Sequence, residues 1–306
     1  MAIAIISPGR NPSAWIKNMK EIDKEIDIQV FPDIVNKDKI TAVMLWQHPK
    51  GILHEFPNLK LICSMGAGVD HILSDETIDS SLPITRIVDE KLTFSMTNYC
   101  IMGILNFHRR TSRFYQLQKS KVWDMSSPEL EVNVGVLGVG ELGGDVVEKL
   151  QFMNFNVFGY GNSPKENLTY PYFYGDQLDS FLQKVNVLVC LLPLTLKTEN
   201  FLNIDFFRKC TMGTYLINVA RGSHLVEEDL LTAIEEGFIS GAMLDVFRKE
   251  PLPQDHPFWE NEKITLTPHI ASVTNPKAAA PQILENYKRM LNNQPLVNLI
   301  DRKKGY

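Results

Sequence analysis

The chain has 306 residues, which is enough for about two domains that each bury a core of their own. Its formal net charge of −5 argues against a general nucleic-acid-binding protein, because such proteins normally carry a basic excess. No apolar run approaches the ~18 residues of a membrane-spanning helix, so we expect no membrane partner and a cytoplasmic location.

The N-terminal part alternates short β-rich runs with helical segments. Its apolar start, residues 2–7, predicts a first strand and not a signal peptide, because no basic segment precedes it. Further strands are predicted at residues 26–31, 41–47 and 59–65, and a helix at residues 11–20. Strands that alternate with helices predict βαβ units and a parallel sheet.

A long stretch, residues 94–121, joins this part to the rest of the chain. Its apolar residues mix with a basic end at Arg109, Arg110 and Arg113, which predicts one connecting helix. We interpret the basic end as the solvated terminus of that helix. A role of Arg109 and Arg110 as ligands of an anion is the alternative.

The second part is more regular. Its strand-like runs are almost continuously apolar, as is typical of strands that are covered on both faces. The predicted strands are residues 131–138, 155–161, 185–193, 213–220, 240–247 and 263–270. The predicted helices are residues 141–152, 176–184, 205–210, 227–236 and, after the last strand, 276–292. Gly237 follows the fourth of these helices as a C′ glycine.

These elements predict an α/β protein with two doubly wound Rossmann-like lobes and an active site in the cleft between them. The first lobe, residues 1–97, is flavodoxin-like, and the last helix returns to complete it with residues 275–306. Residues 98–274 form the second lobe, which we expect to bind a dinucleotide.

The four cysteines show no CxxC spacing, and each lies in or beside an apolar run. They predict buried free thiols in a reducing compartment and no metal site. These residues are Cys63, Cys100, Cys190 and Cys210.

A glycine motif follows the first strand of the second lobe. Gly138, Gly140 and Gly143 have the spacing GxGxxG, between an apolar strand and an amphipathic helix. Such glycines allow a tight turn, close approach to a pyrophosphate and close helix–strand packing, and the amides at the helix start face the phosphates. We therefore assign Gly138, Gly140, Glu141, Leu142 and Gly143 to a cofactor site. A glycine turn without a ligand is the alternative.

The acid that usually binds the ribose hydroxyl, about 20 residues after such a motif begins, is missing. Residues 149–165 contain no Asp or Glu; Gly161 occupies the position, followed by Asn162, Ser163 and Lys165. A carboxylate would repel a 2′-phosphate, whereas small polar residues and a cation would accept it. The gap therefore predicts NADP(H) in preference to NAD(H). An NAD site that tolerates Gly161 is the alternative.

Chemically active side chains end several strands of the second lobe, and ligands bind at such ends in doubly wound sheets. Arg221, Glu250 and His269 form the set that reduction of a 2-keto acid requires. Arg can hold the carboxylate and polarise the carbonyl, His can deliver a proton, and a carboxylate can orient the imidazole and favour its charged form. The same strand ends place Leu192, Pro193, Val219, Ala220 and Asp245 in the predicted cofactor site.

Three long motifs, NVARGSHLVEEDLL, GAMLDVFRKEPLP and TPHIASVTNP, resemble the signatures of the D-isomer-specific 2-hydroxyacid dehydrogenase family. The likeness covers essentially the whole chain. The segments SMGAGVDHIL and DRKKGY are similar to the glyoxylate/hydroxypyruvate reductase A branch of that family. The resemblance implies two Rossmann-like lobes, a homodimer, a preference for NADPH, and catalytic roles for Arg221, Glu250 and His269.

The resemblance also implies an activity: NADPH-dependent reduction of glyoxylate, hydroxypyruvate or a similar small 2-keto acid to the D-2-hydroxy acid. A reductase of bulkier 2-keto acids, such as a phenylpyruvate type, is the alternative among enzymes. A non-catalytic, dinucleotide-sensing interaction protein is the alternative from another class, and the intact catalytic set argues against it.

Further substrate residues follow from the first lobe. The resemblance implies that Gly66, Ala67 and Gly68 offer backbone amides to the substrate carboxylate, and glycines after a strand do allow such an approach. Trp46, at the end of another strand, is expected to wall the pocket or else to pack in the core. In relatives Asp245 contacts the nicotinamide amide; a strand-end turn residue is the alternative. The remaining histidines, including His48, show no partner pattern and are interpreted as structural or exposed.

Overall fold

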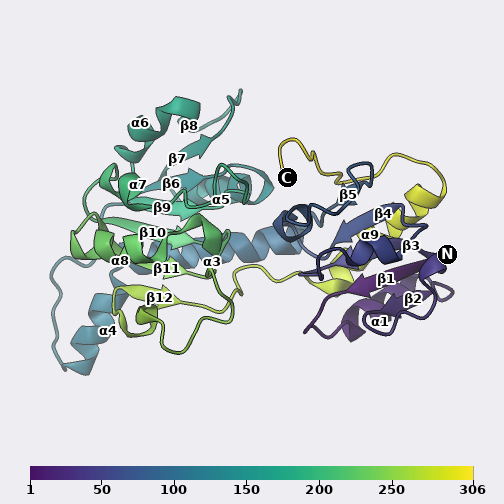
Figure 1. Ribbon diagram of the computed structural model, residues 1–306. Helices are drawn as coiled ribbons and strands as arrows, with labels where there is room; N and C mark the ends of the chain where they lie inside the picture. The colour runs from purple at the N-terminus through teal and green to yellow at the C-terminus, as the bar shows by residue number, and fades with distance from the viewer. Residues whose placement is uncertain (306) are drawn as a thin grey trace. The chain divides into compact units, whose positions relative to one another are not determined.

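The computed structural model describes residues 1–305, so Tyr306, the last residue of the DRKKGY motif, lies outside the described residues. The chain forms two compact units, Met1–Leu92 with Val273–Tyr306, and Thr93–Ser272. Each unit contains one parallel sheet with helices on both faces (Figure 1). The predicted α/β class with two doubly wound sheets is confirmed.

The first unit has a five-stranded sheet in the order β2-β1-β3-β4-β5. This is the flavodoxin-like order, in which the chain reverses direction across the sheet between β1 and β3. Its central strands are apolar and buried along their whole length, as expected for strands that are covered on both faces. The strands are β1 (Ala2–Ile6), β2 (Ile28–Val30), β3 (Ile40–Leu45), β4 (Leu61–Ser64) and β5 (Ile84–Thr85).

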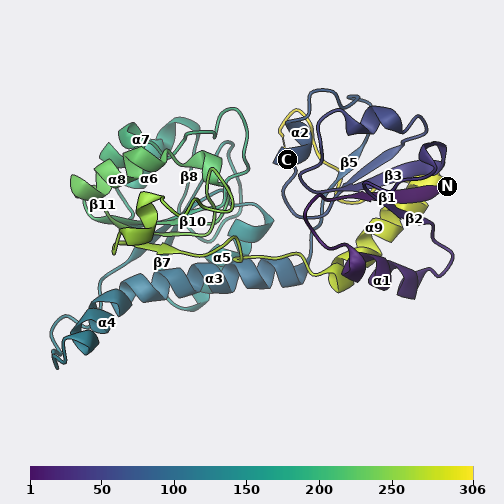
Figure 2. The same ribbon diagram turned by 60° about the horizontal axis from the view of Figure 1, so that its bottom comes forward.

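Helices from both ends of the chain cover one face of this sheet. Trp15 and Met19 of α1 (Ser13–Ile22) pack with the apolar side of α9 (Pro276–Leu291). The other face is covered by η2 (Ile52–Glu55) and α2 (Asp70–Leu73). Figure 2 shows α2 on the side of the sheet opposite α1 and α9. A short 3-10 turn, η1 (Lys37–Lys39), precedes β3.

The second unit has a seven-stranded sheet in the order β12-β11-β10-β9-β6-β7-β8. The first strand of the unit, β6, lies inside the sheet, and the chain reverses direction between β6 and β9, which is the switch point of a Rossmann fold. The strands are β6 (Asn133–Leu137), β7 (Asn156–Gly161), β8 (Tyr172–Tyr174), β9 (Val187–Cys190), β10 (Thr214–Asn218), β11 (Ile239–Leu244) and β12 (Ile264–Leu266).

Two layers of helices enclose this sheet (Figures 1 and 2). One layer contains α3 (Glu90–His108) and α5 (Glu141–Phe152). The other contains α6 (Leu178–Leu182), α7 (Ile204–Arg208) and α8 (Glu227–Glu235). Short 3-10 turns are η3 (Gly175–Gln177), η4 (Gly222–His224) and η5 (Pro257–Glu260).

The single connecting helix predicted at residues 94–121 is wrong. Helix α3 ends at His108, and a separate helix, α4 (Thr111–Lys119), begins after Arg110. Arg110 has a left-handed backbone with φ of +54°, which interrupts the helical hydrogen bonds. Arg109 forms an ion pair with Glu129 at 3.4 Å, and both side chains are exposed.

Several strands also differ from the prediction. The short strands β5 and β8 were not expected, because two or three residues carry too little periodicity to be recognised. The strand predicted at residues 263–270 ends at Leu266, because Pro268 lacks the N–H that a sheet ladder needs. The shorter β12 leaves His269 in a turn, where it adopts a positive φ of 55°.

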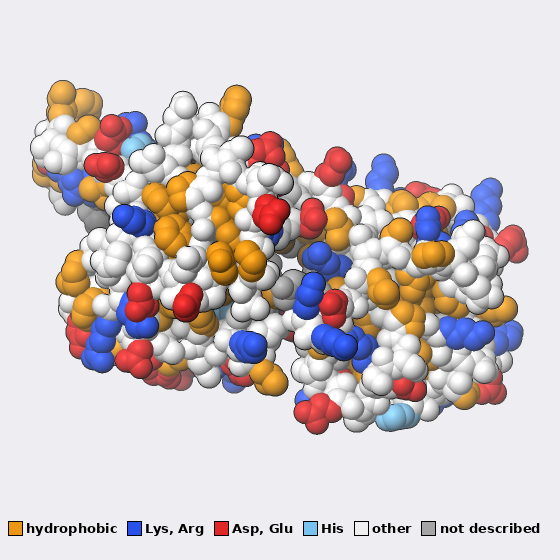
Figure 3. Space-filling view, turned by 90° about the horizontal axis from the view of Figure 1, so that it is seen from above, with side chains coloured by type: hydrophobic (Ala, Val, Ile, Leu, Met, Phe, Trp, Pro, Cys, Tyr) orange, Lys and Arg blue, Asp and Glu red, His pale blue; other side chains and the backbone are white. Residues whose placement is uncertain are grey.

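The four cysteines are free and buried, as predicted. Burial raises the pKa of Cys63 to about 11 and that of Cys190 to about 12, so these thiols are neutral at ordinary pH. Within residues 1–305, no helix is long and apolar enough to cross a membrane. Figure 3 shows acidic and basic side chains interspersed over the visible face.

Candidate active site

The glycine motif forms a tight loop between β6 and α5. Gly138 has φ of +94°, and a Cβ there would lie 2.7 Å from the carbonyl oxygen of Leu191 at the end of β9. A Cβ on Gly143 would lie 2.1 Å from the carbonyl oxygen of Gly138, so α5 begins directly against the loop. A Cβ on Gly140 would meet nothing within 4 Å. Protein atoms therefore pack against Gly138 and Gly143, whereas the space beside Gly140 is empty, as expected for a loop that binds a pyrophosphate.

The loop lies at the switch point between β6 and β9, where ligands bind in such sheets. Leu192 and Pro193 follow β9 directly, and Gly138 packs against this segment. Thr198 donates a hydrogen bond to the Pro193 carbonyl at 2.7 Å and fixes the turn. Val219 and Ala220 follow the neighbouring strand β10. All these predicted cofactor residues lie at the same edge of the sheet, and their contacts with a dinucleotide stay predictions.

The residues predicted to meet a 2′-phosphate lie at the end of β7. Gly161 is the last residue of this strand and is buried, whereas Asn162, Ser163 and Lys165 are exposed in the loop that follows. The Lys165 ammonium donates a hydrogen bond to the carbonyl of Val139, inside the glycine motif. This hydrogen bond connects the loop to the glycine motif.

A close contact between Glu250 and His269 is the most specific feature of the second unit. Glu250 Oε2 lies 2.7 Å from His269 Nδ1, and Oε1 accepts a hydrogen bond from the Phe247 amide at 3.0 Å. Burial raises the pKa of Glu250, but the hydrogen bonds from His269 and Phe247, with the charges of His269 and Arg221, outweigh it and lower that pKa. The carboxylate therefore stays ionised near neutral pH.

Arg221 follows β10 and lies in the turn that begins η4. One of its guanidinium nitrogens, Nη1, donates a hydrogen bond to the Ala220 carbonyl at 2.7 Å. A Cβ on the next residue, Gly222, would lie 1.9 Å from the carbonyl carbon of Phe247, so only glycine allows the two turns to approach so closely. This approach brings Arg221 toward Glu250, whose pKa it helps to lower.

Asp245 holds the turn that carries His269. Its side chain is buried, and its carboxylate accepts hydrogen bonds from Thr267 Oγ1 at 2.6 Å and from the amides of Ile270 and Ala271 at 2.8 Å each. The His269 amide donates to the Asp245 carbonyl, also at 2.8 Å. Asp245 therefore stabilises the turn that follows β12, as one of the two interpretations expected. Its contact with the nicotinamide amide stays a prediction.

The predicted substrate residues of the first unit lie at the ends of β3 and β4. The Gly66 amide donates to Ser64 Oγ at 3.2 Å, whereas the amides of Ala67 and Gly68 make no hydrogen bond within residues 1–305. A Cβ on Gly66 would lie 2.8 Å from the Trp46 ring. The two amides that remain available for an anion are thus those of Ala67 and Gly68.

Trp46 is enclosed by two polar side chains. The Arg10 guanidinium lies 4.3 Å from the centre of its ring, and the His71 ring lies 4.8 Å away. Its buried indole Nε1 has no hydrogen-bond partner among the described residues. These contacts are compatible with both roles that the sequence left open.

Sequence reasoning missed a buried, hydrogen-bonded pair of His48 and Asp75 in the first unit. His48 Nε2 lies 3.2 Å from Asp75 Oδ2, and both side chains are almost fully buried. Burial raises the pKa of Asp75, but hydrogen bonds from Thr77, the Gly51 amide and His48 together lower it to about 2. Burial lowers the pKa of His48, although Asp75 opposes this. The two residues are 27 positions apart, so no local spacing could reveal them.

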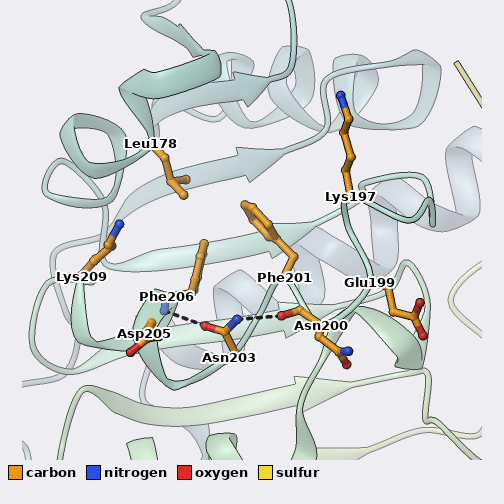
Figure 4. A pocket seen from close by; sticks show the side chains of 9 residues that line it. All are labelled: Leu178, Lys197, Glu199, Asn200, Phe201, Asn203, Asp205, Phe206 and Lys209. Atoms are coloured by element: carbon orange, nitrogen blue, oxygen red, sulfur yellow. Dashed lines mark hydrogen bonds between the residues drawn. The ribbon is translucent and has the colours of Figure 1, made fainter.

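A surface pocket of about 310 Å³ lies elsewhere in the second unit (Figure 4). Asn203 caps α7 there by accepting from the Phe206 amide at 3.0 Å, and Lys209 forms an ion pair with Asp179 at 2.9 Å. None of its lining residues belongs to the glycine loop or to the Arg221, Glu250 and His269 turns. The polar groups of this pocket stabilise local structure.

A glycine loop at a Rossmann switch point, with a carboxylate–imidazole pair and an arginine on nearby strand ends, is typical of a dinucleotide-dependent oxidoreductase. A family model described as "D-isomer specific 2-hydroxyacid dehydrogenase, NAD binding domain" matches residues 101–271. The chain belongs to the D-isomer specific 2-hydroxyacid dehydrogenase family.

Individual relatives agree over the full length. The chain is 36% identical to a glyoxylate/hydroxypyruvate reductase A of Serratia proteamaculans, and the alignment covers 100% of both. It is similar to a family structure from Xanthobacter autotrophicus Py2 in complex with NADPH and MES, with 31% identity, a TM-score of 0.94, and coverage of 100% and 99%. It is also similar to an NADPH-dependent glyoxylate/hydroxypyruvate reductase of Sinorhizobium meliloti in complex with NADP and sulfate, with 30% identity, a TM-score of 0.92 and full coverage of both.

Proposed function

We propose that this protein is an NADPH-dependent reductase that converts glyoxylate, hydroxypyruvate or a similar small 2-keto acid to the D-2-hydroxy acid. The observation that carries the proposal is the 2.7 Å contact between Glu250 Oε2 and His269 Nδ1, with Arg221 on a nearby strand end. The names of full-length relatives, which are glyoxylate/hydroxypyruvate reductases, support the substrate class.

The chemistry divides among three side chains. A bound nicotinamide dinucleotide supplies the hydride. Because Glu250 accepts the Nδ1 proton of His269, the opposite ring nitrogen, Nε2, is the atom that holds the proton for the keto oxygen. Arg221 holds the substrate carboxylate and stabilises the negative charge that develops on the keto oxygen. Glu250 keeps the imidazole oriented through the Nδ1 contact.

The preference for NADPH is supported by the loop after β7. Gly161 replaces the acid that would repel a 2′-phosphate, and Asn162, Ser163 and Lys165 are exposed beside it. Two structural neighbours contain NADPH or NADP. In the first unit, the amides of Ala67 and Gly68 are the proposed donors to the substrate carboxylate.

The reaction is tested by following NADPH oxidation with a panel that contains glyoxylate, hydroxypyruvate, pyruvate and phenylpyruvate. We expect turnover of the small keto acids, and absence of turnover on all of them would refute the proposal. Faster turnover of phenylpyruvate would instead indicate a reductase of bulkier acids.

The acid is tested with a matched pair of histidine variants. His269→Gln should lower kcat by about 10²- to 10⁴-fold, the contribution of general acid–base catalysis, and should leave the Kd for NADPH nearly unchanged. His54→Gln makes the same change at an exposed histidine of the first unit and should have no effect. Equal activity of the two variants would remove His269 from the acid role.

We also propose a homodimer in a reducing compartment such as the cytoplasm. The segment around α4 leaves large apolar side chains exposed, with Trp123 93% and Met125 78% accessible, which supports an interface there. The four buried free cysteines support the compartment. Analytical ultracentrifugation should give a dimer for the native chain, and a monomer for Trp123→Glu with Met125→Glu.

A further inference from the structure

The side chain of Tyr172 reaches both glycines on one face of β7, where Tyr170 and Val139 also approach Gly159. Gly159 and Gly161 are alternate residues of the strand and therefore share a face of the sheet. Tyr172 of the neighbouring strand β8 pairs with Gly159. A Cβ on Gly159 would lie 2.9 Å from Tyr172 Cδ2, and a Cβ on Gly161 would lie 2.3 Å from the Tyr172 hydroxyl. The Tyr172 side chain thus crosses both glycines.

A single oxygen atom, the Tyr172 hydroxyl, leaves no room for a side chain at position 161. Beyond the Tyr172 hydroxyl, the next atoms that a Cβ on Gly161 would meet are Tyr172 Cζ at 3.4 Å and Cε2 at 3.9 Å, which are ordinary contacts. The hydroxyl is held in place because it donates a hydrogen bond to the Ser163 carbonyl at 3.1 Å. An acid at position 161 would therefore have to displace a tyrosine that is bonded to the following loop.

The same hydrogen bond shapes the loop that carries the exposed polar side chains. Tyr172 holds the loop at the Ser163 carbonyl, and Lys165 holds it at the Val139 carbonyl in the glycine motif. Asn162 and Ser163 lie between Gly161 and these two connections, with their side chains exposed. The loop therefore presents its donors from a fixed backbone, which reduces the entropy that ligand binding would cost.

We propose that Tyr172 determines the choice of cofactor: its hydroxyl excludes an acid from position 161 and positions the loop 161–165 to bind the 2′-phosphate of NADPH. This inference rests on the proposed function and assigns its cofactor specificity to a residue outside the motif. It also explains why the strand carries Gly at 161, whereas at Gly159 Tyr170 and Val139 exclude a Cβ as well.

The test is a double-mutant cycle that measures binding alone. Dissociation constants for NADPH and NADH are determined by titration calorimetry for the native protein, Tyr172→Phe, Gly161→Asp, and the double variant. Tyr172→Phe removes the hydroxyl and should weaken NADPH about fivefold, the effect of one lost hydrogen bond, while NADH changes less. Gly161→Asp alone should weaken both cofactors, because its Cβ meets the hydroxyl.

The double variant should bind NADH more than about tenfold better than Gly161→Asp does, because the hydroxyl no longer opposes the acid, and it should prefer NADH to NADPH. Gly161→Ala adds a Cβ without the carboxylate of Asp. Its thermal stability should be lower than that of the native protein, and adding Tyr172→Phe should restore it. Tyr174→Phe on the same strand is the matched control and should change neither cofactor.

Two failures are distinguishable. If the native protein binds NADH as tightly as NADPH, the proposed cofactor preference is wrong. If the native protein prefers NADPH but Tyr172→Phe leaves the affinity and stability of both Gly161 variants unchanged, the role of Tyr172 is overturned while the proposed reductase function stands.

Discussion

Two neighbouring glycines at the start of α5 provide a matched test of the phosphate cradle. A Cβ on Gly143 would lie 2.1 Å from the Gly138 carbonyl oxygen, whereas a Cβ on Gly144 would meet nothing within 4 Å. Neither residue has a positive φ, so the backbone of both accepts alanine. Gly143→Ala and Gly144→Ala are therefore the same chemical change one residue apart, and only the first is obstructed.

The size of the effect follows from that distance. Ordinary contact begins at 3.4 Å, so Gly143→Ala forces α5 and the loop apart by about 1.3 Å, the difference between 3.4 and 2.1 Å. A hydrogen bond of about 2.9 Å does not survive such a shift. Because a bond to a charged group contributes about 1.5–3 kcal/mol, loss of one amide–phosphate contact should weaken NADPH about 10- to 100-fold.

Calorimetric titration with NADPH and thermal unfolding measure the two consequences separately. Gly144→Ala should bind NADPH like the native chain and should be stabilised by up to about 1 kcal/mol, because alanine favours the helix. Gly143→Ala should lose affinity, and it should also lose stability because the overlap strains the packing. Equal NADPH affinities of the two variants would refute the idea that close helix–loop packing forms the cradle.

Three further predictions concern other parts of the chain. Gly222→Ala forces its turn about 1.5 Å away from Phe247 and should lower kcat/KM at least about 100-fold in steady-state assays. The Kd for NADPH is the control, and full activity would contradict the close approach of the two turns. Asp245→Asn replaces one carboxylate oxygen by an NH₂ group, which would face a backbone N–H so that two donors oppose each other. The free energy of unfolding, measured with denaturant, should fall by about 2–3 kcal/mol, and a loss below about 0.5 kcal/mol would be inconsistent with the hydrogen bonds described. The pKa of Asp75 is lowered to about 2, so its stabilisation is complete above about pH 5 and about 2 kcal/mol of it should be lost as the pH drops to 2. The pKa of His48 is also lowered, so stability should start to fall below about pH 6.5. Denaturant midpoints that are flat from pH 7 to 2 would refute both expectations.

The elements that form each sheet could be predicted because their signals are local. Continuous apolar runs marked the central strands, and α5 begins and ends at the residues that its glycines and periodicity indicated. Helix breaks were harder to predict: Arg110 carries no sequence signal of a left-handed backbone, so α3 and α4 were expected to be one helix. The short strand β8 was missed, since three residues give no periodicity.

Candidate site residues could be found from the sequence because they follow strands, and the carboxyl ends of parallel strands share one edge of a sheet. This rule places Arg221, Glu250 and His269 at one edge without any distance information. The rule does not predict contacts between residues that are far apart in the sequence. The approach of Gly222 to Phe247, for example, depends on the backbone geometry of two separate turns. Residues that position others are thus harder to recognise than residues that act.

The missing acid at Gly161 illustrates this limit. The sequence reveals the gap and suggests a cofactor with a 2′-phosphate, because a carboxylate there would repel it. What occupies the gap is the hydroxyl of Tyr172, which belongs to β8, the strand that periodicity could not predict. An acid introduced at position 161 in this chain would meet that hydroxyl before it met any ribose. Cofactor preference is therefore a property of two adjacent strands, and a change at Gly161 is informative only when Tyr172 is changed with it.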